Sequence, residues 1–288
     1  MVNRMIFLTG YPRSGTTFLL NQLLKKYQFI TGPETHYYRL YRNKVKNGAG
    51  KESLVNTRLF DFYNAEAAFN EAKESKRFLE TFMRTSANNY RLPIIEKTPS
   101  HILWWEEILS DYPSCKFIFI VKDPRDVINS NLNVDWSHKN VPKHCLHWKI
   151  HYFAYKRMKK LFPAQIHLLK FEELVVAPEK ELYKVANFLG LNEGITLANE
   201  ISTVPDWEMK WKKQSTSNPD VSKIYKWKSS EKQSLNDDIS YLLSDALFSL
   251  GYDYKVEGHP NIKMRFLRPV LENDLFLSSY LKYRKDRI

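Results

Sequence analysis

Residues 5–24 of the chain read MIFLTGYPRSGTTFLLNQLL, in which an apolar run, a glycine-bounded loop and a leucine-rich stretch follow one another directly. Residues 5–9 are apolar on both faces, which predicts a buried strand of a parallel sheet. Residues 16–27 place leucines on one stripe, which predicts a helix with one apolar side. A strand that turns through such a loop into a helix points several backbone N–H groups at one anion. The stretch therefore predicts a phosphate-binding loop, with a purely structural turn as the alternative.

The residues of this loop distinguish it from loops that bind ATP. Gly10 and Gly15 have the spacing of an ATP-binding P-loop. Such a loop continues with a lysine, which reaches the β- and γ-phosphates, and with a hydroxyl residue, which holds magnesium. Here Thr16 and Thr17 take these two places, and the cation is Arg13 within the loop. We therefore expect an anion other than magnesium-bound ATP.

The rest of the chain alternates between strand and helix patterns. Further apolar runs predict buried strands at residues 28–31, 92–95, 116–121 and 166–170. Helical patterns lie at residues 65–86, 102–109, 125–132, 145–161, 178–189 and 230–250. This alternation predicts an α/β fold in three layers, α/β/α, with a central parallel sheet as in P-loop NTPases. We expect residues 1–258 to form one domain, followed by a basic C-terminal extension over residues 259–288 that packs on this domain or trails from it.

Composition and charge limit the class of protein. The chain has 288 residues, 43% of them apolar or aromatic, which is enough for a sizeable core. Its net charge of +12 indicates polyanionic partners such as nucleotides, nucleic acid, anionic lipid or acidic glycans, unless the charges are simply spread over the surface. The 2 cysteines are too few for a disulfide framework and suit a reducing compartment. With no recognisable signal peptide and no apolar run of membrane-spanning length, we expect a soluble, cytoplasmic protein.

A second segment also runs from strand through turn to helix. Residues 117–130 read FIFIVKDPRDVINS, with Lys122 at the predicted strand end and Ser130 at the end of the segment. Together with YPRSGTTFL at residues 11–19, it resembles the two donor-binding motifs of sulfotransferases that use 3′-phosphoadenosine 5′-phosphosulfate (PAPS). The resemblance implies a 5′-phosphosulfate site formed by Arg13, Ser14, Gly15, Thr16, Thr17 and Phe18. It also implies that the adenine of the donor lies near Phe18.

The same resemblance implies that Lys122 and Ser130 bind the 3′-phosphate of the donor. The family usually has arginine at the place of Lys122. Because lysine lacks the bidentate fork of arginine, Arg125 is a second candidate for this phosphate. Residues 222–227, SKIYKW, resemble a family loop with a basic residue near the 3′-phosphate or the leaving group, which implies a role for Lys226.

Residues 32–38, GPETHYY, resemble a catalytic stretch of the glycan sulfotransferases, and the tyrosylprotein branch also has a glutamate there. The resemblance implies that Glu34 is the base that takes the proton of the acceptor and that His36 is a secondary site residue. The glycan branch commonly has an aspartate after the aromatic pair, where it contacts the acceptor, and this chain departs from it with Arg39. Without the resemblance, Glu34 could equally be a solvated loop carboxylate.

Residues 96–100, EKTPS, resemble a further segment of the glycan branch. The resemblance implies that Lys97 stabilises the bridging oxygen of the donor together with Arg13. Read without it, the threonine and proline of this segment simply start a helix.

These motifs together predict the transfer of a sulfuryl group from PAPS to a hydroxyl, or an amine, of an acceptor, with a saccharide expected first. The displacement is in line, as in phosphoryl transfer, and leaves 3′,5′-ADP. We expect no metal, no nucleic acid partner and no transmembrane segment. The long insertions at residues 35–90 and 195–228 are expected to contact the acceptor. The alternatives are a P-loop nucleotide kinase or NTPase and a non-catalytic polyanion-binding module.

Two further features have a structural interpretation. His144, His147 and His151 share a predicted helix with Cys145, and we expect them to be packing or surface residues rather than zinc ligands. The basic residues after Gly258 are expected to form a solvated, partly ordered tail rather than to contact an anionic acceptor or a membrane.

Overall fold

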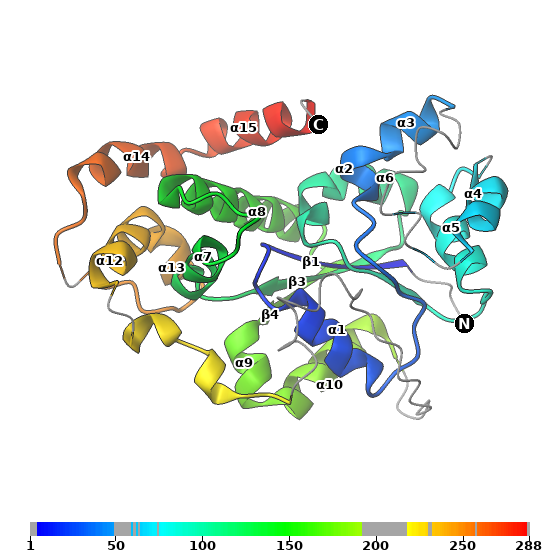
Figure 1. Ribbon diagram of the computed structural model, residues 1–288, viewed down its shortest axis with the longest axis horizontal. Helices are drawn as coiled ribbons and strands as arrows, with labels where there is room; N and C mark the ends of the chain where they lie inside the picture. Colours follow the sequence, from blue (N-terminus) through cyan, green and yellow to red (C-terminus); the bar gives the residue numbers. More distant parts are fainter. Residues whose placement is uncertain are drawn as a thin grey trace.

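The structure is a computed structural model that describes residues 5–48, 59, 62, 64–73, 75–191, 218–229, 232–256 and 258–286. A four-stranded sheet lies at its centre, with the strand order β2-β1-β3-β4 (Figure 1). The strands are β1 (Met5–Gly10), β2 (Ile94–Glu96), β3 (Lys116–Val121) and β4 (Ile166–Lys170). Each neighbouring pair is parallel, so the carboxyl ends of the strands meet at one edge of the sheet.

The side chains of the strands divide between two apolar layers, because successive residues of a strand point to opposite faces. Phe7 and Phe117 belong to one layer, and Ile6, Leu8 and Ile118 to the other. The first layer is covered by α8 (Val141–Leu161), the 3-10 helix η3 (Pro99–Trp104) and α6 (Trp105–Asp111). The second is covered by α1 (Thr16–Leu24), α9 (Phe171–Val176) and α10 (Pro178–Leu189) (Figure 1). The predicted three-layer α/β fold with a central parallel sheet is confirmed.

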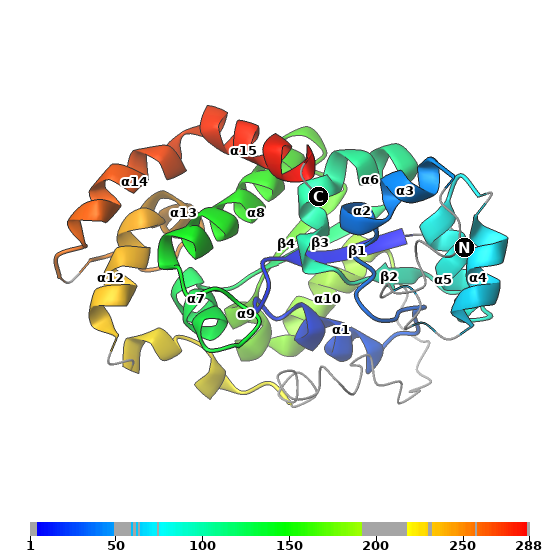
Figure 2. The same cartoon turned by 45° about the horizontal axis from the view of Figure 1, so that its top comes forward.

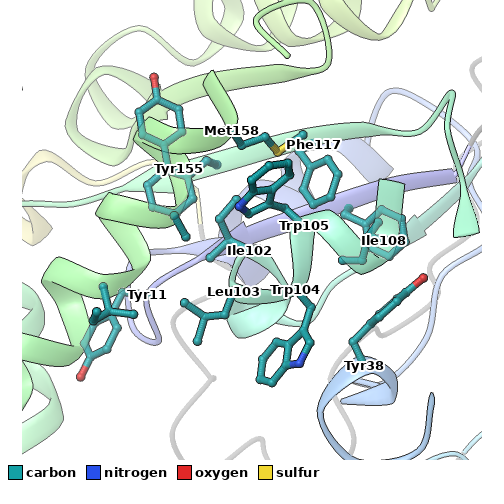
Figure 3. Close-up of a cluster of buried hydrophobic side chains, with 14 of the residues drawn as sticks. Tyr11, Tyr38, Ile102, Leu103, Trp104, Trp105, Ile108, Phe117, Tyr155 and Met158 are labelled. Carbon is teal, nitrogen blue, oxygen red and sulfur yellow. The ribbon is translucent and has the colours of Figure 1, made fainter. Parts of the chain in front are cut away.

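Aromatic side chains fill the first of these layers. Phe7 and Phe117, on neighbouring strands, stack with their ring centroids 5.3 Å apart. Phe119 stacks on Tyr155 of α8, with the ring centroids 4.9 Å apart. Figure 3 shows Trp105 in the same layer. Full burial of each large apolar side chain contributes about 1.5–3 kcal/mol, so this layer holds α8 firmly over the sheet.

One predicted strand is wrong. Residues 28–31 form no strand among the described residues, and only Ile30 pairs, as an isolated bridge to Ile94. The strand predicted at residues 92–95 does form, as β2, but it begins and ends later in the sequence, at Ile94 and Glu96.

The helices lie close to the predicted positions, but three of the patterns each form two shorter helices. The pattern at residues 178–189 is α10, and that at residues 125–132 is α7 (Pro124–Leu132). The divided patterns form α4 (Ala65–Ala72) and α5 (Phe78–Ser86), η3 and α6, and α12 (Gln233–Leu242) and α13 (Ser244–Ser249). The first division occurs because residues 73–77, KESKR, carry no apolar side chain that could hold a helix to the core. Short helices complete the described chain: α2 (Tyr37–Leu40), α3 (Arg42–Lys46), η6 (Val221–Lys223) and η7 (Lys226–Ser229).

The C-terminal extension is helical and packed. Its helices α14 (Ile262–Glu272) and α15 (Asp274–Asp286) run along α8 (Figure 2). The expectation of a solvated tail is wrong over these two helices, because Met264, Leu271, Leu277 and Leu281 are buried. Within the described ranges, no helix is long and apolar enough to cross a membrane. Of the insertion at residues 195–228, residues 195–217 lie outside the described residues.

Candidate functional site

Two glycines hold the shape of the loop between β1 and α1. A Cβ atom on Gly10 would lie 2.5 Å from the carbonyl oxygen of Ile120, and one on Gly15 would lie 2.4 Å from the ring of Phe171. Gly15 also has a φ of 97°, in the left-handed region that favours glycine. A side chain at either position would push the loop away from β3 or α9. The close fit therefore fixes the N-terminus of α1 at the carboxyl edge of the sheet.

A cavity of about 1170 Å³ opens at this edge. Its wall brings together most of the residues that the sequence motifs predicted for the site, namely Arg13, Gly15, Thr16, Thr17, Phe18, Glu34, His36, Lys122, Ser130 and Lys226. Of the other predicted residues, Ser14 and Lys97 are not part of the wall, and both are buried, with exposed fractions of 1% and 2%. Segments far apart in the sequence thus share one cavity.

Arg13 connects the two predicted donor motifs. Its Nε donates a hydrogen bond to the Oγ of Ser130 over 3.1 Å. Burial lowers the pKa of Arg13, but an arginine starts from so high a value that it keeps its charge at neutral pH. A fixed positive charge therefore lies between the N-terminus of α1 and Ser130, where it can contact a ligand with more than one anionic group.

Lys122 lies directly after β3 on the cavity wall. Its Nζ donates a hydrogen bond to the carbonyl oxygen of Lys223 over 3.0 Å and lies 4.4 Å from the centroid of the Phe171 ring. Burial lowers the pKa of Lys122, while the carboxylate of Asp126, 4.0 Å away, acts in the opposite direction. Lys226 reaches the same wall from η7, and Lys223 and Lys232 also line the cavity, so four lysines contribute positive charge to its wall.

Arg125, the second candidate for the 3′-phosphate, has a structural position instead. Its side chain is 1% exposed and pairs with the Asp123 carboxylate over 2.7 Å. Its guanidinium carbon lies 3.6 Å from the ring centroid of Trp227. Asp123 also accepts a hydrogen bond from the backbone N–H of Arg125 and so caps α7. Because these contacts bury the guanidinium away from the cavity wall, Arg125 is not a site residue in this structure.

Glu34 and Lys97 meet although they are 63 residues apart in the sequence. The Lys97 Nζ donates a hydrogen bond to Oε1 of Glu34 over 2.8 Å, and the Nε2 of His36 lies 3.6 Å from the other carboxylate oxygen. The Glu34 side chain is 13% exposed and that of Lys97 only 1%. The carboxylate therefore faces the cavity, and the ammonium group contacts it from inside the protein.

Glu96, which the sequence motifs did not single out, anchors the segment that carries Glu34. Its buried carboxylate accepts hydrogen bonds from the hydroxyls of Thr35 and Thr98, over 2.7 and 2.6 Å, and contacts Nδ1 of His101 at 2.7 Å. Thr98 in turn accepts a hydrogen bond from the backbone N–H of His36. Burial acts to raise the pKa of Glu96, but the nearby His101 and the hydrogen bonds outweigh it and hold the pKa below its usual value. The only sequence signal for this role was its place beside Lys97.

Histidines of α8 form another part of the cavity wall. The Tyr11 hydroxyl donates to Nδ1 of His144 over 2.8 Å, because Nε2 of His144 donates its proton to the carbonyl oxygen of His138. Nδ1 of His151 donates to the carbonyl oxygen of His147 over 2.7 Å. Burial lowers the pKa of His147 to about 2 and that of His151 to about 3, so both are neutral at physiological pH. Among the described residues, no three or more His, Cys, Asp or Glu side chains are arranged so that they could hold a metal ion.

Comparison with known proteins agrees with the motifs in the cavity. A model of the sulfotransferase family matches residues 5–193. A curated relative, described as a putative protein-tyrosine sulfotransferase from Caenorhabditis briggsae, is 27% identical over an alignment of 206 positions that covers 65% of this chain. The chain spans 66% of the length of that relative.

Two solved structures have a similar fold. One is the sulfotransferase domain from the curacin biosynthetic pathway, with a TM-score of 0.56, 18% identity, and coverage of 88% of this chain and 99% of that one. The other is the sulfotransferase domain from the Synechococcus PCC 7002 olefin synthase, with a TM-score of 0.56, 18% identity, and coverage of 94% of each chain. At this level of identity, the likeness concerns the fold alone.

Proposed function

Because the chain belongs to the sulfotransferase family, we propose that it transfers a sulfuryl group from PAPS to a hydroxyl of an acceptor. The acceptor oxygen attacks the sulfur while the bond between the sulfur and the bridging oxygen of the phosphosulfate breaks. The proton of the acceptor passes to Glu34, and 3′,5′-ADP leaves. An amine acceptor would react in the same way.

The contact between Arg13 and Ser130 carries the proposal for the donor. It places the cation of the first loop against the end of the second motif in one cavity. The leaving product has phosphates on the 5′ and 3′ positions of one ribose, and Lys122 supplies a further positive charge on the same wall. A charge-assisted contact to a phosphate is roughly twice as strong as a neutral hydrogen bond. The alternative of a kinase is weaker, because Thr16 stands where ATP-binding loops have their lysine.

Glu34 is proposed as the base because its carboxylate faces the cavity beside the phosphate loop. Asp126, another carboxylate of the wall, is a weaker candidate for the base because it already has partners. It accepts a hydrogen bond from the backbone N–H of Trp227 and lies near Lys122. Arg13, which lines the cavity, is proposed to stabilise the bridging oxygen of the donor. The resemblance assigned Lys97 to the bridging oxygen as well, but we propose that it acts through Glu34 by holding the carboxylate in place, since its ammonium group is bonded to Glu34.

The acceptor is proposed to be a saccharide. In support, the wall away from the donor loops carries neutral hydrogen-bonding side chains, such as His144, His151 and Ser137, which suit a ligand with many hydroxyls. A tyrosine hydroxyl of a protein is the second candidate, favoured by the description of the relative from Caenorhabditis briggsae.

Thermal unfolding with two nucleotides tests the donor. We expect 3′,5′-ADP to stabilise the protein, by about 2.7 kcal/mol at a hundred times its Kd, and ATP with magnesium to stabilise it far less. Stabilisation by ATP with magnesium and none by 3′,5′-ADP would overturn the proposal in favour of a kinase. A screen of labelled sulfate transfer from PAPS to saccharides, tyrosine peptides and small phenols then decides between the acceptors.

A further inference from the structure

Part of the cavity wall lies outside the donor loops and beyond the aromatic pair of the stretch that carries Glu34. It carries two arginines, Arg39 of α2 and Arg284 of α15. We propose that these two arginines form a subsite for an anionic group, a carboxylate or a sulfate, of an acidic saccharide acceptor. The inference rests on the proposed function, because it names the kind of acceptor that the same cavity takes.

Arg284 is held in the wall by a helix that is well anchored. Leu281 of α15 is buried, and the Nζ of Lys285 lies 2.9 Å from the carboxylate of Glu107 on α6. The Tyr280 hydroxyl lies 3.3 Å from Nε2 of a histidine of α8. Both cartoon views place the end of α15 beside α6 and α2 (Figures 1 and 2). These contacts on either side of Arg284 fix the direction from which its side chain enters the cavity.

The charge of Arg284 lacks a counterion among the described residues. Its Nη1 is buried and has no hydrogen-bond partner there, and no described carboxylate pairs with Arg284 or with Arg39. Burial lowers the pKa of Arg284, the nearby Tyr280 opposes this, and the charge of Arg39 adds to it, so the two guanidinium groups affect each other. A buried donor without a partner costs about 1–3 kcal/mol. An anion between the two arginines would satisfy the donor and remove the repulsion.

A second unsatisfied group on the same wall points to hydroxyls beside the anion. His151 is 3% exposed, and its Nδ1 donates to a backbone carbonyl, so its Nε2 is an acceptor. That Nε2 is buried without a partner among the described residues. Trp136, also on the wall, is 54% exposed and offers a flat apolar face. An anionic group, a hydroxyl donor and a ring with an apolar face occur together in an acidic sugar.

A matched pair of acceptors tests the subsite. One is a tetrasaccharide that contains uronates, and the other is the same tetrasaccharide after its carboxyl groups are reduced to alcohols. For Arg284→Gln we expect the KM of the acidic tetrasaccharide to rise about 10- to 100-fold, as for the loss of one charge-assisted contact. The KM of the reduced tetrasaccharide and the affinity for 3′,5′-ADP should change by less than about twofold. Arg284→Lys should keep part of the preference, because the charge remains.

Lys282→Gln is the control, since it removes an exposed positive charge from the same helix. It should behave like the wild type with both acceptors. A wild-type enzyme that sulfates both tetrasaccharides equally well would overturn the inference and leave the proposed function intact. Transfer to an acidic tyrosine peptide and to no saccharide would also overturn it.

If no acceptor is sulfated, the proposed function fails, and calorimetric binding of the two tetrasaccharides in the presence of 3′,5′-ADP tests the subsite by itself. Preferential binding of the acidic tetrasaccharide that disappears in Arg284→Gln supports the inference. Equal binding, or none, overturns it.

Discussion

Replacing Glu34 by glutamine changes two measurable properties for two different reasons. The amide cannot take the proton of the acceptor, and a general base contributes about 10²- to 10⁴-fold to a rate. We therefore expect kcat for sulfate transfer to fall by about that factor. The affinity for 3′,5′-ADP should stay the same, because Arg13, Lys122 and Ser130 are unchanged.

The same replacement should destabilise the protein, because it takes the negative charge away from Lys97. That ammonium group is 2.8 Å from the carboxylate and its side chain is only 1% exposed. Removing one partner of a buried pair costs about 3–5 kcal/mol. Since Glu34 itself is 13% exposed, we expect the lower end, about 3 kcal/mol, which corresponds to a fall in Tm of roughly 6–10 °C.

The double variant Glu34→Gln/Lys97→Met separates the two effects. It removes the buried ammonium group as well, so we expect most of the stability to return while the transfer rate stays low. Glu179→Gln is the control, because it breaks an exposed pair with Lys26 in which the glutamate is 76% exposed, and it should cost at most about 1 kcal/mol. Urea unfolding, calorimetry with 3′,5′-ADP and labelled sulfate transfer provide the three measurements. If the single variant turns over normally, Glu34 is not the base, and if it is as stable as the wild type, the reasoning about Lys97 is wrong.

Three further predictions concern the loop and the histidines. Arg13→Ala should weaken the binding of 3′,5′-ADP by about 10- to 100-fold in calorimetry, because a charged contact is lost; an unchanged Kd would count against its role. Gly15→Ala should lower the free energy of unfolding by more than about 1 kcal/mol in urea, since its φ of 97° and the Phe171 ring leave no room for a Cβ; full stability would contradict the geometry. The pKa of His151 is about 3 in the folded protein, so between pH 6.5 and 3 the unfolded chain holds a proton that the folded protein lacks. Stability should therefore fall on acidification by up to about 1.4 kcal/mol per pH unit for this residue, and His151→Gln should flatten the slope over that range.

The central part of the fold could be predicted because its signals are local. Residues 5–24 contain a strand, a loop and a helix in one continuous stretch, and Gly10 and Gly15 mark the loop that joins them. The apolar run at residues 28–31 was misleading, because an apolar run reports burial and not pairing with a neighbouring strand. The sequence left the C-terminal extension between a packed segment and a solvated tail, because the apolar side chains of residues 262–286 do not show which surface they cover.

The contacts within the candidate site depend on the tertiary structure. The motifs singled out Arg13 and Ser130 as separate residues, and they did the same for Glu34 and Lys97. The members of the first pair are 117 residues apart in the sequence, and those of the second are 63 apart. They meet because the order β2-β1-β3-β4 sets the carboxyl ends of three strands side by side. No pattern within a single segment contains this strand order.

By itself, the sequence determined the strand, loop and helix of residues 5–24, the class of fold and the family, because each depends on residues that are neighbours along the chain. Only the tertiary structure decided which neighbours each charged group contacts. Arg125 and Arg284 are both basic residues in the sequence, yet Arg125 is closed into a buried pair with Asp123, while Arg284 brings a nitrogen without a described partner to the cavity wall. The physical reason is that the effect of a charge depends on its burial and on the distance to other charges, and both are determined by neighbours in space.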